Sequence, residues 1–276
     1  MPSQRNTLGD FNVNDSKNTR MEMDKSFINF DFRKDEIMHL GRYQNSAHTM
    51  VDLAKKLGRP IRVLDIGCGE VNTVRLFYRS VLEKKSDIIE SYTGIDIDYK
   101  MAEAAKENYG KCYEACNTEI VIQDLTVNPH FDVPDNYYDF IICFEFLEHI
   151  QPKFAPAILK EAFRVLNPEG KALFSTPNSN GSNAKLPKDH VYEYSYEELM
   201  ELFTEVGFTI EHTVGVCVNI SRIPVEEKED WEEELEKIYN AFGYNSAFAS
   251  VVCAPLFSPR YCKNVVYHLL KENDGN

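Results

Sequence analysis

The sequence has no long apolar run and no excess of positive charge. No apolar stretch approaches the roughly 18 residues of a membrane span, and the polar first 20 residues have no signal-peptide core. Acidic residues outnumber basic ones by 44 to 30, which gives a net charge of −14. Such a field repels polyanions and disfavours nucleic acid as a partner, although a local basic cleft is still compatible with holding one RNA end.

The seven cysteines lack the paired spacing of a secreted disulfide framework. This usage predicts a reducing, cytoplasmic location. Residues 1–24 are polar with few large apolar side chains, which predicts a disordered tail. The remaining residues, 25–276, are predicted to form one elaborated domain, because a chain of this length with 43% hydrophobic side chains can bury a full core. The oligomeric state stays open.

Short apolar runs alternate with amphipathic stretches along most of the chain. Helical spacing over about residues 35–57 predicts N-terminal cap helices, and a further helix is expected to end at about Leu82. Strands alternating with helices predict an α/β fold, a Rossmann-like doubly wound, mostly parallel sheet with helices on both faces. The predicted strands are IRVLDIG, YTGIDI, EIVIQDL, YDFIICFE and KALFSTP.

The last third of the chain continues this pattern with additions. A helix is predicted from Tyr196 to Val206, with Gly207 as its stop, and FTIEHTVGV follows as a strand. The charged segment at about 224–243 predicts a helical insertion on the surface. The final segment, KNVVYHLLK, is predicted to be an edge strand.

Acidic residues end three consecutive predicted strands. In Val63–Gly69 an apolar strand ends in Asp65 and two alternating glycines, Gly67 and Gly69. Glycines there let the chain turn tightly and let a ligand approach the backbone, although alone they also fit a turn that binds nothing. Asp96 ends the second strand, where a carboxylate accepts hydrogen bonds from ribose hydroxyls, and Asp124 ends the third, where it accepts one from an adenine amino group.

From about residue 35 to 215 the sequence resembles the class I S-adenosylmethionine-dependent methyltransferase family. The resemblance rests on VLDIGCG, GIDID, IQDL, YYDFIICFEFLEHI, the turn LNPEG and FSTPN. It implies S-adenosylmethionine as the cofactor, with its methionine part at the first motif, its ribose at Asp96 and its adenine at Asp124. The other residues of the predicted cofactor site are Ile97, Leu125 and Tyr43. Two departures affect loop geometry: Val71 replaces a usual third glycine, and residues 83–90 look like an insertion.

Ligands of open α/β sheets bind beyond the carboxyl ends of the strands, so the segment after YDFIICFE is predicted to face the methyl acceptor. It carries Glu145, Glu148 and His149, and His190 follows the next strand. In the preferred interpretation His149 or His190 is a general base, with Glu145 as a third catalytic candidate, and a small molecule accepts the methyl group on oxygen or nitrogen. A simpler alternative is that Glu148 and His149 cap the fourth helix.

A further alternative treats Glu145, Glu148, His149 and His190 as ligands of Mn²⁺, Co²⁺ or Zn²⁺, since mixed carboxylate and imidazole ligands suit these ions better than Mg²⁺. The same segments resemble the small-RNA 3′-terminal 2′-O-methyltransferase family, in which a metal would hold the terminal ribose hydroxyls. The acidic charge favours the metal-independent small-molecule interpretation instead. A third hypothesis, a non-catalytic protein that binds the cofactor, is equally compatible with the three strand-end acids.

Overall fold

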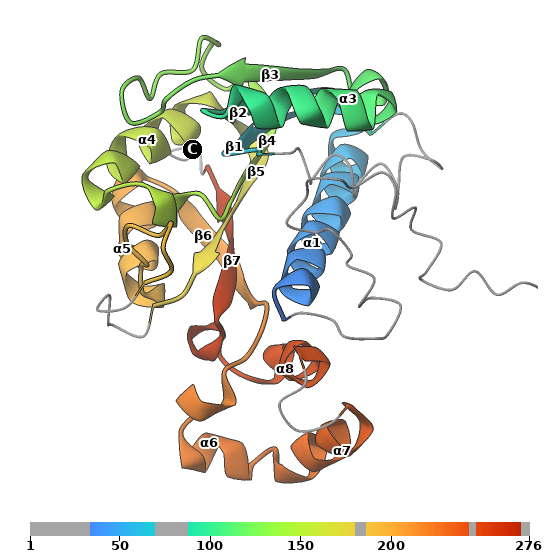
Figure 1. Cartoon of the computed structure of the whole chain (residues 1–276), viewed down its shortest axis with the longest axis vertical. Helices are drawn as coiled ribbons and strands as arrows, with labels where there is room; N and C mark the ends of the chain where they lie inside the picture. The colour runs from blue at the N-terminus through green and yellow to red at the C-terminus, as the bar shows by residue number, and fades with distance from the viewer. Residues whose placement is uncertain (1–33, 70–87, 180–185, 243–246, 272–276) are drawn as a thin grey trace, which may run out of the picture.

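The computed structural model describes residues 34–69, 88–179, 186–242 and 247–271, which form one continuous sheet with helices on both sides (Figure 1). The predicted tail at 1–24, the helix expected to end at Leu82, Val71 and most of the proposed insertion at 83–90 lie outside these residues. The strands are β1 Ile61–Ile66, β2 Ile89–Asp96, β3 Thr118–Ile122, β4 Tyr138–Phe144, β5 Leu166–Pro177, β6 Thr209–Gly215 and β7 Asn264–Leu270.

The sheet has the order β3-β2-β1-β4-β5-β7-β6. The strands from β3 to β5 pair in parallel, whereas β7 is antiparallel to both of its neighbours. The direction of strand order reverses between β1 and β4, and this reversal is where open α/β sheets form their ligand crevice. The predicted Rossmann-like class is therefore confirmed.

Helices cover both faces of the sheet. The helices are α1 Lys34–Leu57, α3 Tyr99–Ala115, α4 Ala155–Val165, α5 Tyr196–Val206, α6 Val225–Glu229, α7 Glu232–Phe242 and α8 Ala247–Cys253. One apolar cluster joins α4 and α5 to the sheet, and a second joins α1 and α3 to the opposite face. α5 has the predicted bounds, with a capping box at Ser195 and with Gly207 in the left-handed conformation after its end. No helix of the described segments has the length and apolar composition needed to cross a membrane.

Three expectations about individual elements need correction. The C-terminal strand β7 is not an edge strand: it lies between β5 and β6, and six of its seven residues are buried. Its nearly continuous apolar sequence is typical of an interior strand, whereas a half-exposed edge strand would alternate. The insertion forms two helices, α6 and α7, and the LNPEG segment lies within the bounds of β5 instead of forming a separate turn.

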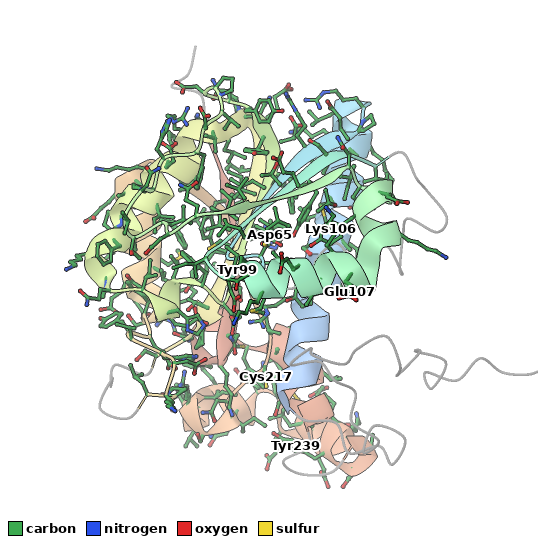
Figure 2. All side chains as sticks on the ribbon, turned by 45° about the horizontal axis from the view of Figure 1, so that its top comes forward. Asp65, Tyr99, Lys106, Glu107, Cys217 and Tyr239 are labelled. Atoms are coloured by element: carbon green, nitrogen blue, oxygen red, sulfur yellow. The ribbon has the colours of Figure 1, made fainter. Side chains whose placement is uncertain are left out.

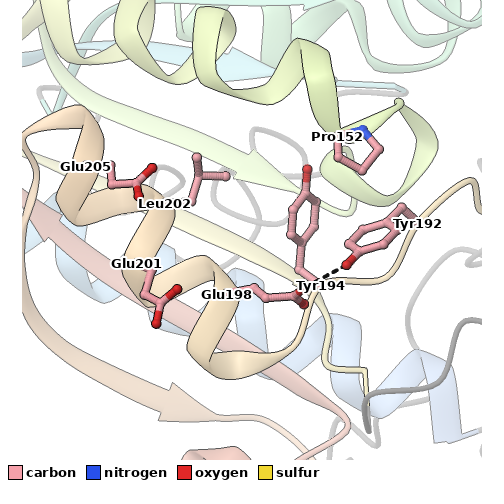
Figure 3. A pocket seen from close by; sticks show the side chains of 7 residues that line it. All are labelled: Pro152, Tyr192, Tyr194, Glu198, Glu201, Leu202 and Glu205. Carbon is pink, nitrogen blue, oxygen red and sulfur yellow. Dashed lines mark hydrogen bonds between the residues drawn. The ribbon is translucent and has the colours of Figure 1, made fainter.

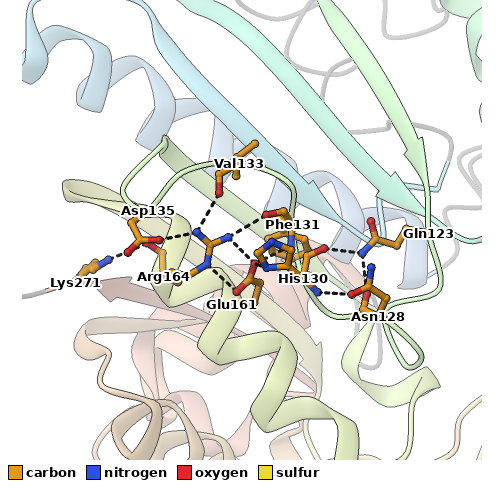
Figure 4. Close-up of polar contacts among 9 residues, drawn as sticks. All are labelled: Gln123, Asn128, His130, Phe131, Val133, Asp135, Glu161, Arg164 and Lys271. Atoms are coloured by element: carbon orange, nitrogen blue, oxygen red, sulfur yellow. Dashed lines mark hydrogen bonds and ion pairs between the residues drawn. The ribbon is translucent and has the colours of Figure 1, made fainter.

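An arginine on α4 fixes the loop between β3 and β4 (Figure 4). The Arg164 guanidinium donates hydrogen bonds to the backbone oxygens of Phe131 and Val133, and it pairs with the carboxylates of Glu161 and Asp135. Backbone carbonyls of a loop otherwise need water, so this charge-assisted network stabilises one loop conformation. The loop leads away from the end of β3 and so helps to hold that end of the predicted cofactor site in place.

Candidate cofactor and acceptor site

Two glycines shape the turn after β1. Gly67 and Gly69 have φ of +70° and +50°, in the left-handed region that L side chains rarely adopt. A Cβ atom at Gly67 would stand 2.7 Å from the Phe146 ring, and one at Gly69 would stand 3.6 Å from the Met101 methyl group. The turn thus requires glycine at both positions, and at Gly67 it also requires the space. The space beside Gly67 is taken by the Phe146 ring, so the close approach of a ligand to this backbone stays a prediction.

Asp65 lies inside the protein, near the centre of the molecule in Figure 2. It accepts a hydrogen bond from the hydroxyl of Tyr92 on β2, a partner that the sequence did not reveal. Burial, together with the charge of Asp65, raises the pKa of Tyr92 well above its ordinary value, so the phenol keeps its proton and remains a donor. Asp65 therefore ties β1 to β2 directly below the glycine turn. Its predicted contact with the cofactor stays a prediction.

Asp96 connects the end of β2 to the glycine turn. One carboxylate oxygen accepts from the backbone N–H of Gly69 at 2.8 Å, and the other accepts from that of Asp98 at 2.9 Å. Each carboxylate oxygen keeps a further lone pair, so the group can still accept from a ribose diol. The next residue, Ile97, exposes 64% of its surface beside it. An exposed apolar side chain next to a partly occupied carboxylate fits a nucleoside.

Asp124 follows β3 and turns the chain there. One of its carboxylate oxygens accepts from the Thr126 hydroxyl at 2.7 Å and from the Thr126 backbone N–H at 2.9 Å. The bond from the hydroxyl is the main reason that the pKa of Asp124 is lowered, so the group is ionised at neutral pH. Leu125 is buried beside it, and Tyr43 packs its ring 6.0 Å from that of Phe144 at the end of β4. The predicted cofactor residues thus lie at the carboxyl ends of β1, β2, β3 and β4.

Glu145 follows β4 with φ of +54°, which is strained for a residue with a side chain. Its carboxylate forms an ion pair with Arg42 of α1, whose side chain is 1% exposed, and accepts two hydrogen bonds of 3.1 Å from Asn264 of β7. Ser175 of β5 is a further donor at 3.4 Å. Glu145 is thus held by α1, β5 and β7, and it does not belong to the group that Glu148 and the two histidines form.

Glu148, His149 and His190 come together, with one candidate ligand atom from each within 4.8 Å of the others. Glu148 is 1% exposed; one of its oxygens accepts from the Thr176 hydroxyl at 3.0 Å, and the other is buried without a hydrogen-bond partner. Nε2 of His149 lies 3.9 Å from that unpartnered oxygen. Burial and the nearby charge of Glu145 raise the pKa of Glu148 well above its usual range.

Each imidazole is oriented through its other nitrogen. Nδ1 of His149 donates to the backbone oxygen of Asp189 at 2.8 Å, and Nδ1 of His190 donates to the carboxylate of Glu193 at 2.7 Å. In the neutral rings the lone pairs are therefore on Nε2, which suits proton acceptance or metal binding. The two rings meet edge to face with centroids 5.2 Å apart. The arrangement offers two fixed imidazole lone pairs beside one buried carboxylate oxygen.

The structure does not support the helix-capping alternative. Leu147–His149 forms a short 3₁₀ turn, and α4 begins after Phe154 with no side-chain hydrogen bond at its N-cap. Glu148 and His149 instead contact β5 and the segment before His190. The 3₁₀ turn starts at Leu147, so Glu145 is not on the same helix as Glu148 and His149. The side chain of Glu145 therefore does not point to the same side as theirs.

A hollow lies between η6 Pro152–Phe154 and α5 (Figure 3), and Tyr192 connects its wall to this group. The hydroxyl of Tyr192, two residues after His190, donates to the carboxylate of Glu198 at 2.6 Å, and the backbone N–H of Tyr192 donates to the backbone oxygen of Glu148. The hollow is lined by two tyrosines, three glutamates, a proline and a leucine: Tyr192, Tyr194, Glu198, Glu201, Glu205, Pro152 and Leu202. Its walls are aromatic and acidic.

Sequence reasoning missed the partners that orient the site. Arg42 and Asn264 contact Glu145 from positions 103 and 119 residues away, which no local spacing indicates. Glu193, by contrast, is three residues from His190, and an acid at that interval is a detectable signal. Tyr92 is an aromatic residue within a predicted strand, and its pairing with Asp65 follows only from the register of β1 and β2.

Comparison with known proteins agrees with this fold. A solved S-adenosylmethionine-dependent methyltransferase of Archaeoglobus fulgidus superposes with a TM-score of 0.54 at 17% identity, over 90% of this chain and 100% of that one. A probable S-adenosylmethionine-dependent methyltransferase of Mycolicibacterium smegmatis is 31% identical over 192 residues, 68% of this chain and 63% of the relative. The ubiquinone biosynthesis O-methyltransferase of Yersinia enterocolitica is 26% identical over 119 residues, 43% of each chain.

The fold, with glycines and acids at the ends of successive strands, is that of the class I S-adenosylmethionine-dependent methyltransferases. A family model described as a methyltransferase domain matches residues 39–213, more than half of the sequence. The chain belongs to this methyltransferase family, which confirms the resemblance. It spans less than two thirds of the length of the two curated relatives named above.

Proposed function

We propose that this chain is an S-adenosylmethionine-dependent O-methyltransferase whose acceptor hydroxyl binds at Glu148, His149 and His190. The observation that carries the proposal is the pair of oriented imidazole lone pairs beside an unpartnered, buried carboxylate oxygen. The group lies at the carboxyl end of β5, where Glu148 contacts Thr176, and Phe146, two residues before Glu148, packs against Gly67 of the glycine turn. A hydroxyl there would have a proton acceptor within reach on the side where the cofactor is expected.

The residues present fit the cofactor. Gly67 and Gly69 give the turn its left-handed backbone, Asp96 has lone pairs for a ribose diol, and Ile97 offers an apolar surface for a base. When bound, S-adenosylmethionine supplies an activated methyl group. The chain's own residues then need only hold the acceptor oxygen in line with that methyl group and remove its proton.

A small molecule is the first candidate acceptor. The ubiquinone biosynthesis relative is an O-methyltransferase, and the acidic, aromatic hollow that Tyr192 helps to line suits an uncharged or cationic ring better than a phosphodiester chain. His149 would accept the hydroxyl proton on Nε2, while the Asp189 backbone oxygen keeps its ring oriented. Glu145 is held in place by Arg42 and Asn264, and its negative charge would act on the neighbouring Glu148.

The second candidate acceptor is the 3′-terminal ribose of RNA, methylated on its 2′ oxygen with the help of a metal. The observation that favours it is that both histidines have the outer hydrogen bonds typical of metal ligands, to a backbone oxygen and to a carboxylate. Glu148, His149 and His190 would hold the ion, and a divalent ion would also keep the buried Glu148 ionised. Mn²⁺, Co²⁺ or Zn²⁺ fits these ligands better than Mg²⁺, and the ion would orient the two ribose hydroxyls.

One assay separates the candidates. Transfer of a radiolabelled methyl group is measured to a panel of phenols and catechols, and to a single-stranded oligoribonucleotide with or without its terminal 2′ hydroxyl. Each reaction is run with EDTA and then with added Mn²⁺ or Co²⁺. Phenol methylation at the same rate with and without EDTA supports the first candidate. Methylation only of RNA that has the 2′ hydroxyl, lost with EDTA and restored by the ion, supports the second.

Variants then test the residues. His149→Ala, or His190→Ala, lowers turnover by about 10² to 10⁴ if that ring is the only base, whereas under the metal hypothesis Glu148→Gln, His149→Ala and His190→Ala fail alike. His130→Ala is the matched control, because His130 is an exposed histidine paired with Glu161 outside the site. Cofactor binding without transfer to either panel would contradict the proposal and favour the non-catalytic hypothesis.

A further inference from the structure

Two histidines lie opposite each other on the neighbouring strands β6 and β7. His212 and His268 are register partners, and their rings stack with centroids 4.0 Å apart. The register shifts between Ile210 and His212, and a bulge of this kind lets two successive residues face the same side. Glu211 thereby joins the pair, with a carboxylate oxygen 3.6 Å from Nδ1 of His212. One candidate ligand atom from each of the three residues lies within 4.8 Å of the others.

His268 is oriented from α1. It is 3% exposed, and its Nε2 lies 2.9 Å from the side-chain oxygen of Asn45, which accepts a hydrogen bond. The proton is therefore on Nε2 and the lone pair is on Nδ1, which is buried without a hydrogen-bond partner. An outer acceptor that fixes the tautomer of a buried histidine is the arrangement typical of metal ligands. His212 is half exposed, so an ion can enter from solvent. Because imidazole lone pairs lie in the ring plane, the exposed His212 ring would turn out of its stack with His268 to bind the same ion.

A lysine stands where it would compete with a cation. Nζ of Lys171 on β5 donates to both oxygens of Glu211, at 2.5 and 2.7 Å. Each carboxylate oxygen has a second lone pair, so Glu211 can ligate an ion while it keeps one of these bonds. The positive charge of Lys171 nevertheless opposes a second cation. Removing this charge should therefore strengthen metal binding, which a merely structural cluster would not predict.

We propose that Glu211, His212 and His268 form a second binding site for a divalent ion of borderline softness, such as Zn²⁺. Two imidazoles and one carboxylate, with water in the remaining position, are a common ligand set for this ion. The site is separate from the one beside His190, because His268 is level with Leu173 within the sheet, whereas Thr176, which contacts Glu148, is near the carboxyl end of the same strand β5. The bound ion would link β6 to β7.

The test uses the full chain with the other histidine group removed. In a His149→Ala, His190→Ala double variant, calorimetry with Zn²⁺ should show one equivalent bound, and the melting temperature should rise with added Zn²⁺. Adding His212→Ala should weaken binding at least about tenfold, since losing a ligand costs no less than losing an outer partner. Adding His130→Ala should leave binding unchanged, and adding Lys171→Met should tighten it.

Two results would overturn the proposal: the double variant binds no Zn²⁺, or it binds Zn²⁺ equally well with and without His212→Ala. Circular dichroism checks that each variant is folded. Should His212→Ala fail to fold, Glu211→Gln replaces it with the same expected loss. Since the double variant lacks the acceptor-site histidines, the outcome is independent of the proposed methyltransferase activity.

Discussion

Asp96 is the residue whose two functions can be separated by experiment. It accepts hydrogen bonds from Gly69 and Asp98, and it is the proposed acceptor for the ribose hydroxyls. Because those hydroxyls are the same in S-adenosylmethionine and in its demethylated product, Asp96→Ala should weaken both ligands equally. Loss of a hydrogen-bonded charged group predicts about 1.5 to 3 kcal/mol per bond, roughly a tenfold to hundredfold rise in Kd, measured by calorimetry.

Asp98→Ala is the matched control for this prediction. Asp98 accepts from the backbone N–H groups of Lys100 and Met101 at the start of α3, so its loss should lower stability by about 1 kcal/mol without changing affinity. If Asp96→Ala binds both ligands as well as the unaltered protein does, Asp96 is not in the cofactor site.

The strand-end acids and glycines could be predicted from sequence because their positions follow local rules. Each acid ends an apolar run, and parallel strands bring their carboxyl ends to one edge of the sheet. Glu148, His149 and His190 were candidates for the same reason. The surroundings of Glu145 could not be predicted, because Arg42 and Asn264 approach it from distant elements whose placement depends on the whole topology.

At the scale of elements, α1 is attached to the sheet through a buried charge. Arg42 is 1% exposed and pairs with Glu145, whose side chain is 24% exposed. Breaking a buried pair by removing one partner leaves the other charge poorly solvated. Arg42→Met should therefore lower the free energy of unfolding by about 3 kcal/mol, measured by urea denaturation.

The double variant distinguishes charge from packing. Glu145→Gln in the Arg42→Met background removes the unpaired carboxylate, so it should restore more than about 1 kcal/mol of the loss. If the two single changes are simply additive, the ion pair does not connect α1 to the sheet.

The helices and strands themselves were largely predictable from the sequence, whereas the order of the strands in the sheet was not. Tyr196–Val206 has the expected bounds because both of its ends carry strong local signals, a capping box and a left-handed glycine. The strand character of Asn264–Leu270 was also evident, but its place between β5 and β6 was not. Strand order depends on packing across the whole sheet, and the sequence of one strand indicates only whether it is buried.

At the scale of the whole molecule, His268 should make stability depend on pH. Burial, with the adjacent His212, lowers the pKa of His268 from 6.5 to about 4, while Glu211 opposes and Lys171 reinforces this shift. The unfolded chain then binds a proton that the folded chain does not, so stability is fully present above about pH 6.5 and is lost as the pH falls toward 4. Between about pH 7 and pH 5 the loss should be about 2 kcal/mol.

The measurement is chemical denaturation in the presence of EDTA, which removes any metal from the histidines. The comparison is with His268→Asn, which has no titrating ring at this position and should lose about 2 kcal/mol less over the same range. Parallel pH profiles for the two proteins would show that His268 is not the group responsible.

The position of β7 has a consequence for how the protein is made. During synthesis β6 leaves the ribosome before β7, yet β7 is the strand that joins it to β5. Until β7 emerges, β5 has an open edge and β6 lacks the described strand with which it pairs, so a nascent chain can assemble only the parallel part of this sheet. A chain whose translation stops before β7 would expose unpaired strand edges. Such a chain would be prone to aggregation and would depend on chaperones.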